Sequence, residues 1–349
     1  MALLGGLVVG KEAVVFHNRA SIFRRLLPYF LLTVCGLMVL PWIGGETIQP
    51  AGVWAWFRDH GSIHGIIFFE QRLPRVIAGL LVGGGLAIAG SCLQILFRNP
   101  LAEPWTLGIS GGASVGAFVA YAFPRMISLP FGLDSTALLA MIGAGAVLGL
   151  LLWCSQRRGA LPVQTLLLGG VTISVLTSGI IMLSVYFISP YRFFSFHRWM
   201  MGGLDISGYE SMLPFLLTGG PGVVLLLSLA RAFNHLTLGE ELAQGHGVDI
   251  RRVHRQALLG AGLVTAGCVS LAGPIGFVGL IVPHAVRRLS GYDSRIVLPA
   301  AGMLGGLVLA LADAAARTVL APTEIPVGVI MAVVGGPVFL YLLLRRAQP

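Results

Sequence analysis

Long apolar runs are the feature that most constrains how this chain can fold. A helix needs roughly 20 apolar residues to cross the hydrocarbon core of a membrane, and ten such candidate segments follow one another along the chain. They are 26–43, 76–97, 106–123, 136–154, 162–189, 212–231, 256–272, 274–286, 296–316 and 326–344. The run at 274–286 is short and contains glycine and proline, which predicts a tilted or partly broken helix. The sequence therefore predicts an all-α membrane protein with about ten transmembrane helices.

The composition excludes a water-soluble domain. Only 11% of the residues are charged, whereas soluble domains carry about 25%, so the chain could not cover a water-facing surface. The 48 glycines suit close helix–helix packing in lipid, where small residues let backbones approach. The four cysteines, Cys35, Cys92, Cys154 and Cys268, stand alone in apolar segments. We interpret them as small packing residues.

The distribution of basic residues predicts the orientation. With the N-terminus inside, 16 of the 23 Lys and Arg residues fall in inside segments and seven fall outside. The positive-inside rule then favours an even number of spans with both termini cytoplasmic. Topology therefore accounts for the net charge of +9 better than nucleic-acid binding does. We expect a cytoplasmic N-terminal segment at 1–25 and a single ten-helix membrane domain at 26–345.

Enzymatic motifs are missing from the sequence. There is no zincin pattern, nucleophile elbow or catalytic carboxylate pair, and a Walker A loop needs a lysine after its second glycine. Lys11 is the only lysine and no such loop surrounds it. We therefore expect no catalytic residues, cofactor or metal in this chain. His60 and His64 could lie on one helical face and touch a metal or haem iron, but solvated surface histidines are the favoured interpretation.

Acidic residues within the spans are scarce. Asp313 lies well inside a predicted span, and Glu324 lies near a span end. Asp313 precedes Arg317 by four residues, a spacing that suits an ion pair on one helix. A proton-coupled carrier usually keeps several buried ionisable groups. A stand-alone proton- or ion-coupled carrier is therefore the weaker alternative, although one acid can suffice for a simple carrier.

Several independent motifs follow one another along about residues 70–345. They are Arg72-Leu73-Pro74-Arg75, Asn99-Pro100-Leu101-Ala102-Glu103-Pro104, Leu107-Gly108-Ile109-Ser110-Gly111-Gly112-Ala113, Gly276-Phe277-Val278-Gly279-Leu280-Ile281-Val282-Pro283-His284, Leu311-Ala312-Asp313 through Arg317, Glu324-Ile325-Pro326-Val327-Gly328 and Gly335-Gly336-Pro337-Val338-Phe339. In these motifs and in their order, the chain resembles the bacterial permease family of iron-siderophore, haem and cobalamin ABC importers. The resemblance implies that the domain at 26–345 is a permease domain in the bacterial inner (cytoplasmic) membrane.

The resemblance implies an assembly and a task. A second permease subunit, which we expect to be another copy of this chain, would form the pathway with it. Two separate ATPase subunits would bind ATP and Mg²⁺, and a periplasmic binding protein would deliver a metal chelate. An iron–siderophore complex is the favoured cargo because it is the broadest class in the family. Haem and cobalamin stay open.

The resemblance also assigns roles to residues. Arg72, Arg75 and Arg317 match outward-facing arginines, which we expect to be exposed and to meet acidic residues of the binding protein. Anchoring of a span end is the alternative for Arg72 and Arg75. The polar segment 232–255, predicted to form two short helices with a glycine-bearing turn, matches the ATPase-coupling segment. Its matching residues are Gly239, Glu240, Glu241, Gly245 and Gly247, and His246 stands where most relatives have leucine. The cytoplasmic gate positions are Asn99, Leu101, Pro162, Val163 and Gln164, and relatives are more polar at 162 and 163.

Overall fold

Helices make up the fold of this protein, for which we use a computed structural model. It describes residues 19–58, 60–124, 134–157, 163–184 and 186–346, and within these ranges there is no β-strand. The helices are α1 (Arg19–Val39), α2 (Pro50–Ala55), α3 (Ile63–Ile66), α4 (Leu73–Leu96), α5 (Ile109–Ala122), α6 (Ser135–Arg157), α7 (Val163–Ser184), α8 (Pro190–Met200), α9 (Leu213–Ser228), α10 (Ala230–Thr237), α11 (Glu240–Gly245), α12 (Ile250–Ala272), α13 (Val278–Ser290), α14 (Ser294–Ala316) and α15 (Val327–Arg346). Shorter turns are η1 (Leu40–Trp42), η3 (Pro104–Leu107), η5 (Glu210–Met212) and the π-helical turn η2 (Ile67–Arg72).

Each predicted span overlaps with a helix of the structure. The helices concerned are α1, α4, α5, α6, α7, α9, α12, α13, α14 and α15. Six helical stretches of the described residues are long and apolar enough to cross a membrane, and α5 and parts of α7 and α15 form shorter apolar helices. The prediction of an all-α multi-pass membrane protein is confirmed. The first helix begins earlier than expected, because the basic stretch from Arg19 is already helical.

The predicted span at 274–286 is wrong in its bounds. Residues 273–276 are not helical, and Gly273 and Phe277 both adopt positive φ, at 67° and 69°. Helix α13 therefore begins at Val278 and has 13 residues, which gives a length of about 20 Å. That length is less than the roughly 30 Å of a bilayer core, so α13 alone is too short to cross it.

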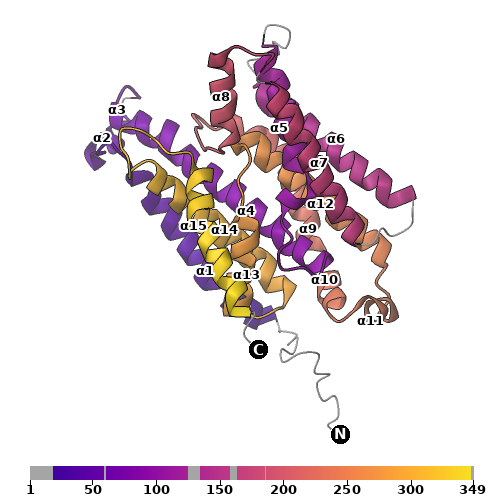
Figure 1. Cartoon of the computed structure of the whole chain (residues 1–349). Coiled ribbons are helices and arrows are strands. Elements are labelled where there is room, and N and C mark those ends of the chain that lie inside the picture. The colour runs from indigo at the N-terminus through magenta and orange to yellow at the C-terminus, as the bar shows by residue number, and fades with distance from the viewer. Residues whose placement is uncertain (1–18, 59, 125–133, 158–162, 185, 347–349) are drawn as a thin grey trace.

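Helix α4 forms the centre of the bundle, packed against α12, α13 and α14, while α5 pairs with α6 and α9 pairs with α12 (Figure 1). Glycines allow the closest of these approaches. A Cβ on Gly90 of α4 would collide with the backbone carbonyl of Gly279 in α13, and one on Gly83 would collide with that of Gly305 in α14. The small residues therefore serve the close packing that the composition predicts.

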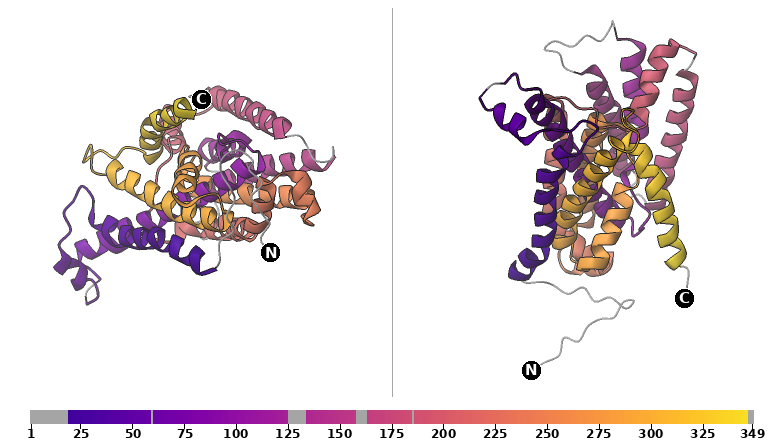
Figure 2. Two further views of the ribbon diagram at one scale, coloured as in Figure 1. Left: turned by 90° about the horizontal axis from the view of Figure 1, so that it is seen from below. Right: turned by 90° about the vertical axis from the view of Figure 1, so that its left-hand side faces the viewer.

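The two ends of the bundle carry different elements. The start of α1 and the end of α15 lie at one end of the molecule, where α10 and α11 also lie, and α2, α3 and α8 lie at the opposite end (Figures 1 and 2). This arrangement matches an even number of crossings. We refer to the end with α10 and α11 as the inner end and to the other as the outer end. Helices α7 and α15 lie along one side of the bundle (Figure 2).

Candidate docking and coupling sites

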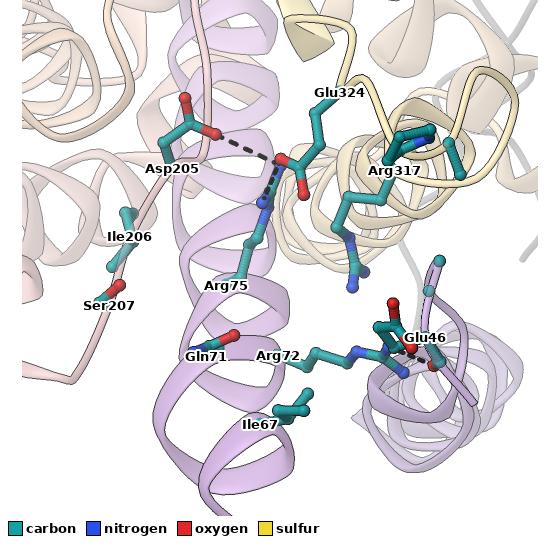
Figure 3. A pocket seen from close by; sticks show the side chains of 14 residues that line it. Glu46, Ile67, Gln71, Arg72, Arg75, Asp205, Ile206, Ser207, Arg317 and Glu324 are labelled. Carbon is teal, nitrogen blue, oxygen red and sulfur yellow. Dashed lines mark hydrogen bonds and ion pairs between the residues drawn. The ribbon is translucent and has the colours of Figure 1, made fainter. Parts of the chain in front are cut away.

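A charged cavity of about 610 Å³ lies at the outer end. Three arginines line it from two elements (Figure 3): Arg72 and Arg75 at the start of α4, and Arg317 just after α14. Acidic residues from three loops, Glu46, Asp205 and Glu324, complete the charged lining. The structure thus brings the three predicted docking arginines together, although they are up to 245 positions apart in the sequence (72 and 317).

Arg75 is the hub of the ion-pair network. Its Nε donates to both carboxylate oxygens of Asp313, at 3.0 and 3.1 Å. Its Nη1 donates to Glu324 Oε2 at 2.7 Å, and its Nη2 lies 3.5 Å from Asp205 Oδ1. Charge-assisted bonds of this kind are stronger than neutral ones. One guanidinium therefore ties α4 to α14 and to the loops that precede α9 and α15.

Arg317 and Arg72 complete the network. Arg317 Nε lies 3.1 Å from Asp313 Oδ2, so the predicted pair at a spacing of four is present, and Arg317 Nη1 donates to the Ile43 carbonyl at 3.1 Å. Its Nη2 is buried and has no hydrogen-bond partner among the described residues. Arg72 donates to the carbonyls of Trp42 and Glu46, at 3.4 and 2.5 Å. The Arg317 side chain points toward the Arg72 guanidinium group (Figure 3).

The expectation that these arginines are exposed is wrong. Arg72 and Arg317 are only 6% and 5% exposed, and the Arg75 side chain only 12%. The buried Asp313 and the carbonyls of the 42–46 segment hold the guanidinium groups inside the cavity. Sequence reasoning missed Asp205 and Glu46, because neither lies near one of the three docking arginines in the chain and no local pattern marks them.

The predicted coupling segment lies at the inner end. It contains the two expected short helices, α10 and α11, with Gly239 between them at a φ of 121° and Gly247 after α11 at a φ of 81°. Residues 250–255 instead form the first turns of α12. Glu240, Glu241 and Gly245 are exposed, whereas Ala243 is fully buried. The coupling segment is therefore an ordered pair of short helices with an exposed acidic face.

His246 makes contacts within the coupling segment. Its Nδ1 lies 2.7 Å from the Leu242 carbonyl, and its ring stacks on that of His235 with centroids 5.4 Å apart. The ring contact joins α10 to the end of α11. His246, which the family pattern predicts to be an unusual residue at this position, therefore packs within the segment.

A buried polar node fixes α10 to α14. Asn234 Nδ2 donates to Asp293 Oδ1 at 2.8 Å, and Ser294 N donates to Asn234 Oδ1 at 2.7 Å. Asp293 also caps α14 by accepting from Arg295 N at 3.0 Å, and it pairs with Arg295 Nη2 at 2.7 Å. Sequence reasoning missed this node, although an aspartate directly before a helix is a recognisable cap signal.

Acid should remove the stabilisation that Asp293 supplies. Burial alone would raise the pKa of Asp293, but hydrogen bonds from Arg295 and Asn234 outweigh it and lower the pKa to about 2. A depressed folded-state pKa contributes stability above the unfolded value of about 3.9 and loses it as pH falls toward the folded value. We expect Asp293→Asn to lower the melting temperature at pH near 7, and the difference from the wild type to shrink between about pH 4 and 2.

Thermal melts of the purified protein across this pH range check the prediction. Asp249→Asn is the control, because Asp249 caps α12 through Arg252 N at 3.0 Å but is exposed. Its effect on the melting temperature should be smaller than that of Asp293→Asn. A melting-temperature difference for Asp293→Asn that stays constant across the range would contradict the assignment.

The predicted gate is only partly described. Asn99 and Leu101 lie in the turn after α4, where Asn99 Oδ1 accepts from Leu101 N at 2.9 Å and Leu101 is exposed. This turn leads into η3, which packs against α7. Pro162 lies outside the described residues, and only the backbone is described for Val163 and Gln164 at the start of α7. The gate assignment stays a prediction.

The two outer histidines do not share a helix. His64 lies in α3, whereas His60 precedes that helix and contacts the Trp56 ring with centroids 4.5 Å apart. The spacing of four therefore does not put them on one helical face, because α3 begins only at Ile63. Within the described ranges, no group of three or more His, Cys, Asp or Glu side chains is placed to hold a metal ion.

Comparison with known proteins identifies the class. Residues 31–345 match the FecCD transport family. The chain is 43% identical over 346 residues to the cobalamin import system permease protein BtuC of Halobacterium salinarum, covering 97% of this chain and 85% of that protein. It is 35% identical to the vitamin B12 import system permease protein BtuC of Vibrio cholerae, covering 92% and 93%. It is 34% identical to the hemin transport system permease protein HmuU of Yersinia pestis, covering 93% and 97%.

A solved structure agrees with these relatives. An inward-facing metal-chelate-type ABC transporter superimposes with a TM-score of 0.79 at 29% identity, covering 92% of this chain and 99% of that one. The fold and its charged outer cavity therefore define a multi-pass permease of the ABC import class. The chain belongs to the FecCD transport family.

Proposed function

We propose that this chain is the membrane-spanning subunit of an ATP-driven importer for a cobalamin or haem type of metal chelate. The observation that carries the proposal is the likeness along nearly the whole chain to permeases named for cobalamin, vitamin B12 and hemin. The sequence alone favours an iron–siderophore cargo, because that is the broadest substrate class in the family. The names of these relatives favour cobalamin or haem as the cargo instead. The chain has no enzymatic role of its own in this proposal.

A second permease subunit, expected to be another copy of this chain, would pack on the side formed by α7 and α15. Helix α7 exposes Val175 and Met182 there, and α15 exposes Val333. These large apolar side chains need either lipid or a protein partner. A pathway between two copies would leave the packed interior of each bundle intact, which supports placing the cargo route at this interface.

Two partner ATPases would dock on α10 and α11 at the inner end. The exposed Glu240 and Glu241 offer carboxylates to such a partner, and the Asn234–Asp293 hydrogen bond would link a movement of α10 to α14. ATP and Mg²⁺ would be bound by those subunits. A binding protein would dock at the outer cavity, where its carboxylates would meet Arg72, Arg75 and Arg317.

The alternative of a stand-alone proton-coupled carrier has less support. Asp313 is the acid that such a mechanism would need, but it is held by Arg75 and Arg317 at 3.0 and 3.1 Å. It also lies in the last turn of α14, at the outer end. This placement suits a structural ion pair better than a proton relay.

Uptake by proteoliposomes tests the proposal. The tagged chain would be purified from its host in mild detergent, reconstituted with the ATPase that co-purifies and with the binding protein, and supplied with radiolabelled cyanocobalamin, haemin or a ferric siderophore. We expect ATP-dependent uptake of cobalamin or haemin. Uptake of the ferric siderophore, with no uptake of cobalamin or haemin, would identify an iron–siderophore complex as the cargo. Flux driven by a pH gradient without ATP would overturn the importer assignment.

A further inference from the structure

A small helical hairpin projects from the outer end beyond α1 (Figures 1 and 2). We call residues 50–58 and 60–66, which comprise α2 and α3, the outer hairpin. The π-helical turn η2 joins it to α4, so the hairpin continues the central helix of the bundle outward. None of the docking or coupling residues above belongs to it, and the proposed transport function leaves it unexplained.

The outer hairpin has an aromatic core of its own. Trp56 packs on Phe69 with ring centroids 4.6 Å apart, and Ser62 Oγ donates to the Gly52 carbonyl at 2.7 Å. Gly65 lies so close to the Trp56 side chain that a Cβ there would collide with it. These contacts fix the two short helices against each other. The outer hairpin therefore has a fixed conformation, with an inner face that contains Trp56 and an outer face that points away from it.

The outer face of this unit is apolar. Trp54, Phe57 and Ile63 are 73%, 61% and 71% exposed, whereas Val53 on the other side of α2 is buried. The Trp54 and Phe57 rings lie side by side at the end of α2, with centroids 5.8 Å apart. Fully exposing side chains of this size to water costs about 1.5–3 kcal/mol each relative to burial. A protrusion surrounded by water would be expected to carry polar residues at these positions.

The apolar face continues a surface that already faces lipid. Helix α1, a membrane-span candidate with little of its surface buried in the bundle, exposes Phe30 and Met38. Trp42 and Ile43 extend this exposed row past the end of α1 toward the outer hairpin. Tryptophan and other aromatic residues gather where acyl chains meet headgroups. The row therefore leads from the hydrocarbon region of the membrane to its outer interface.

We propose that the outer hairpin is a membrane-interface anchor, with Trp54, Phe57 and Ile63 inserted among the headgroups and upper acyl chains of the outer leaflet. Arg58, which is exposed beside them, would pair with lipid phosphate, as interfacial basic residues do. The anchor would hold the start of α4, where Arg72 and Arg75 lie, at a fixed depth. Phospholipid is the occupant because the patch is continuous with the lipid-facing row of α1.

Quenching of tryptophan fluorescence by brominated phospholipid tests the anchor. The intact complex would be placed in nanodiscs of phosphatidylcholine and phosphatidylglycerol, brominated either near the headgroup end or near the middle of the acyl chain. The contribution of Trp54 is the fluorescence intensity of the wild type minus that of Trp54→Phe in the same lipid. We expect the lipid brominated near the headgroup to reduce this contribution at least about twofold, and the lipid brominated at mid-chain to reduce it less.

Two further variants keep the test decisive. The signal lost in Trp56→Phe serves as the matched control, because Trp56 lies on the inner face of the same hairpin and should be quenched less than Trp54. If Trp54→Phe does not fold, Phe57→Trp adds a reporter on the outer face, and its added emission should show the quenching expected of Trp54.

Three results would overturn the proposal. The Trp54 contribution could be equal in brominated and unbrominated lipid, which would mean that the residue does not meet lipid. It could change only when the binding protein is added, which would make the outer hairpin a protein-docking surface. Cross-linking of Ile63→Cys to a second copy of the chain would assign the face to a subunit interface.

Discussion

Replacing Asp313 with asparagine is expected to lower the melting temperature of the purified protein by about 5–10 °C. Asp313 is 1% exposed and is shared by Arg75 and Arg317, at 3.0 and 3.1 Å. Its neutralisation leaves two buried guanidinium groups close together with no buried counter-charge. Removing one partner of a buried ion pair costs about 3–5 kcal/mol, because the remaining charge is not compensated.

Glu324→Gln is the matched control for this substitution. It makes the same chemical change in a carboxylate that binds the same arginine, with Arg75 Nη1 at 2.7 Å, but its side chain is 38% exposed. Exposed ion pairs contribute about 0–1 kcal/mol, so the melting temperature should change by only about 1–2 °C. Thermal melts of both variants in the same detergent make the comparison. Equal shifts for the two would show that burial of Asp313 does not determine the stability of the cluster.

The membrane spans were predictable because the length of an apolar run is a local property of the chain. The bounds at 274–286 were not, since apolar content does not report the backbone turn at Gly273 and Phe277, where φ is positive. The Gly273-Pro274 pair is the one local sign that the helix is interrupted there. Hydropathy therefore located the segment but could not show that α13 starts four residues later.

The charged site was predictable in part, for a similar reason. The Asp313–Arg317 pair follows from a spacing of four on one helix. The partners of Arg75 do not, since Glu324 is 249 residues away in the sequence and Asp205 lies in a different loop. Exposure of the arginines was mispredicted because a position at a span end usually faces the interface. Only the tertiary fold shows that the 42–46 segment covers Arg72.

Burial of the arginines changes how the docking proposal is best tested. Reversing the charge of all three at once would place new carboxylates beside Asp313, Glu324 and Asp205, and the fold itself would suffer. Arg72 avoids this problem, because its hydrogen bonds go to the carbonyls of Trp42 and Glu46 and no carboxylate lies within ion-pair distance of it among the described residues. Its replacement therefore removes a charge from the cavity without leaving a buried acid unpaired.

We expect Arg72→Gln to weaken docking of the binding protein by about 10- to 100-fold while basal ATP hydrolysis of the complex stays unchanged. A hydrogen bond to a charged group contributes about 1.5–3 kcal/mol, which corresponds to that range of affinity. The measurement is a titration of the reconstituted complex with binding protein, read as stimulated ATP hydrolysis.

Arg198→Gln is the control for Arg72→Gln, because Arg198 is an exposed arginine of the outer end that pairs with Asp205 at 3.0 Å. Its loss should move the midpoint of the titration by no more than about fivefold, as expected for a solvent-screened pair. An unchanged midpoint in Arg72→Gln would mean that Arg72 only fastens the 42–46 segment to α4. Docking would then depend on Arg75 and Arg317, and the cavity would have to open before a partner carboxylate could reach the buried, unpaired Nη2 of Arg317.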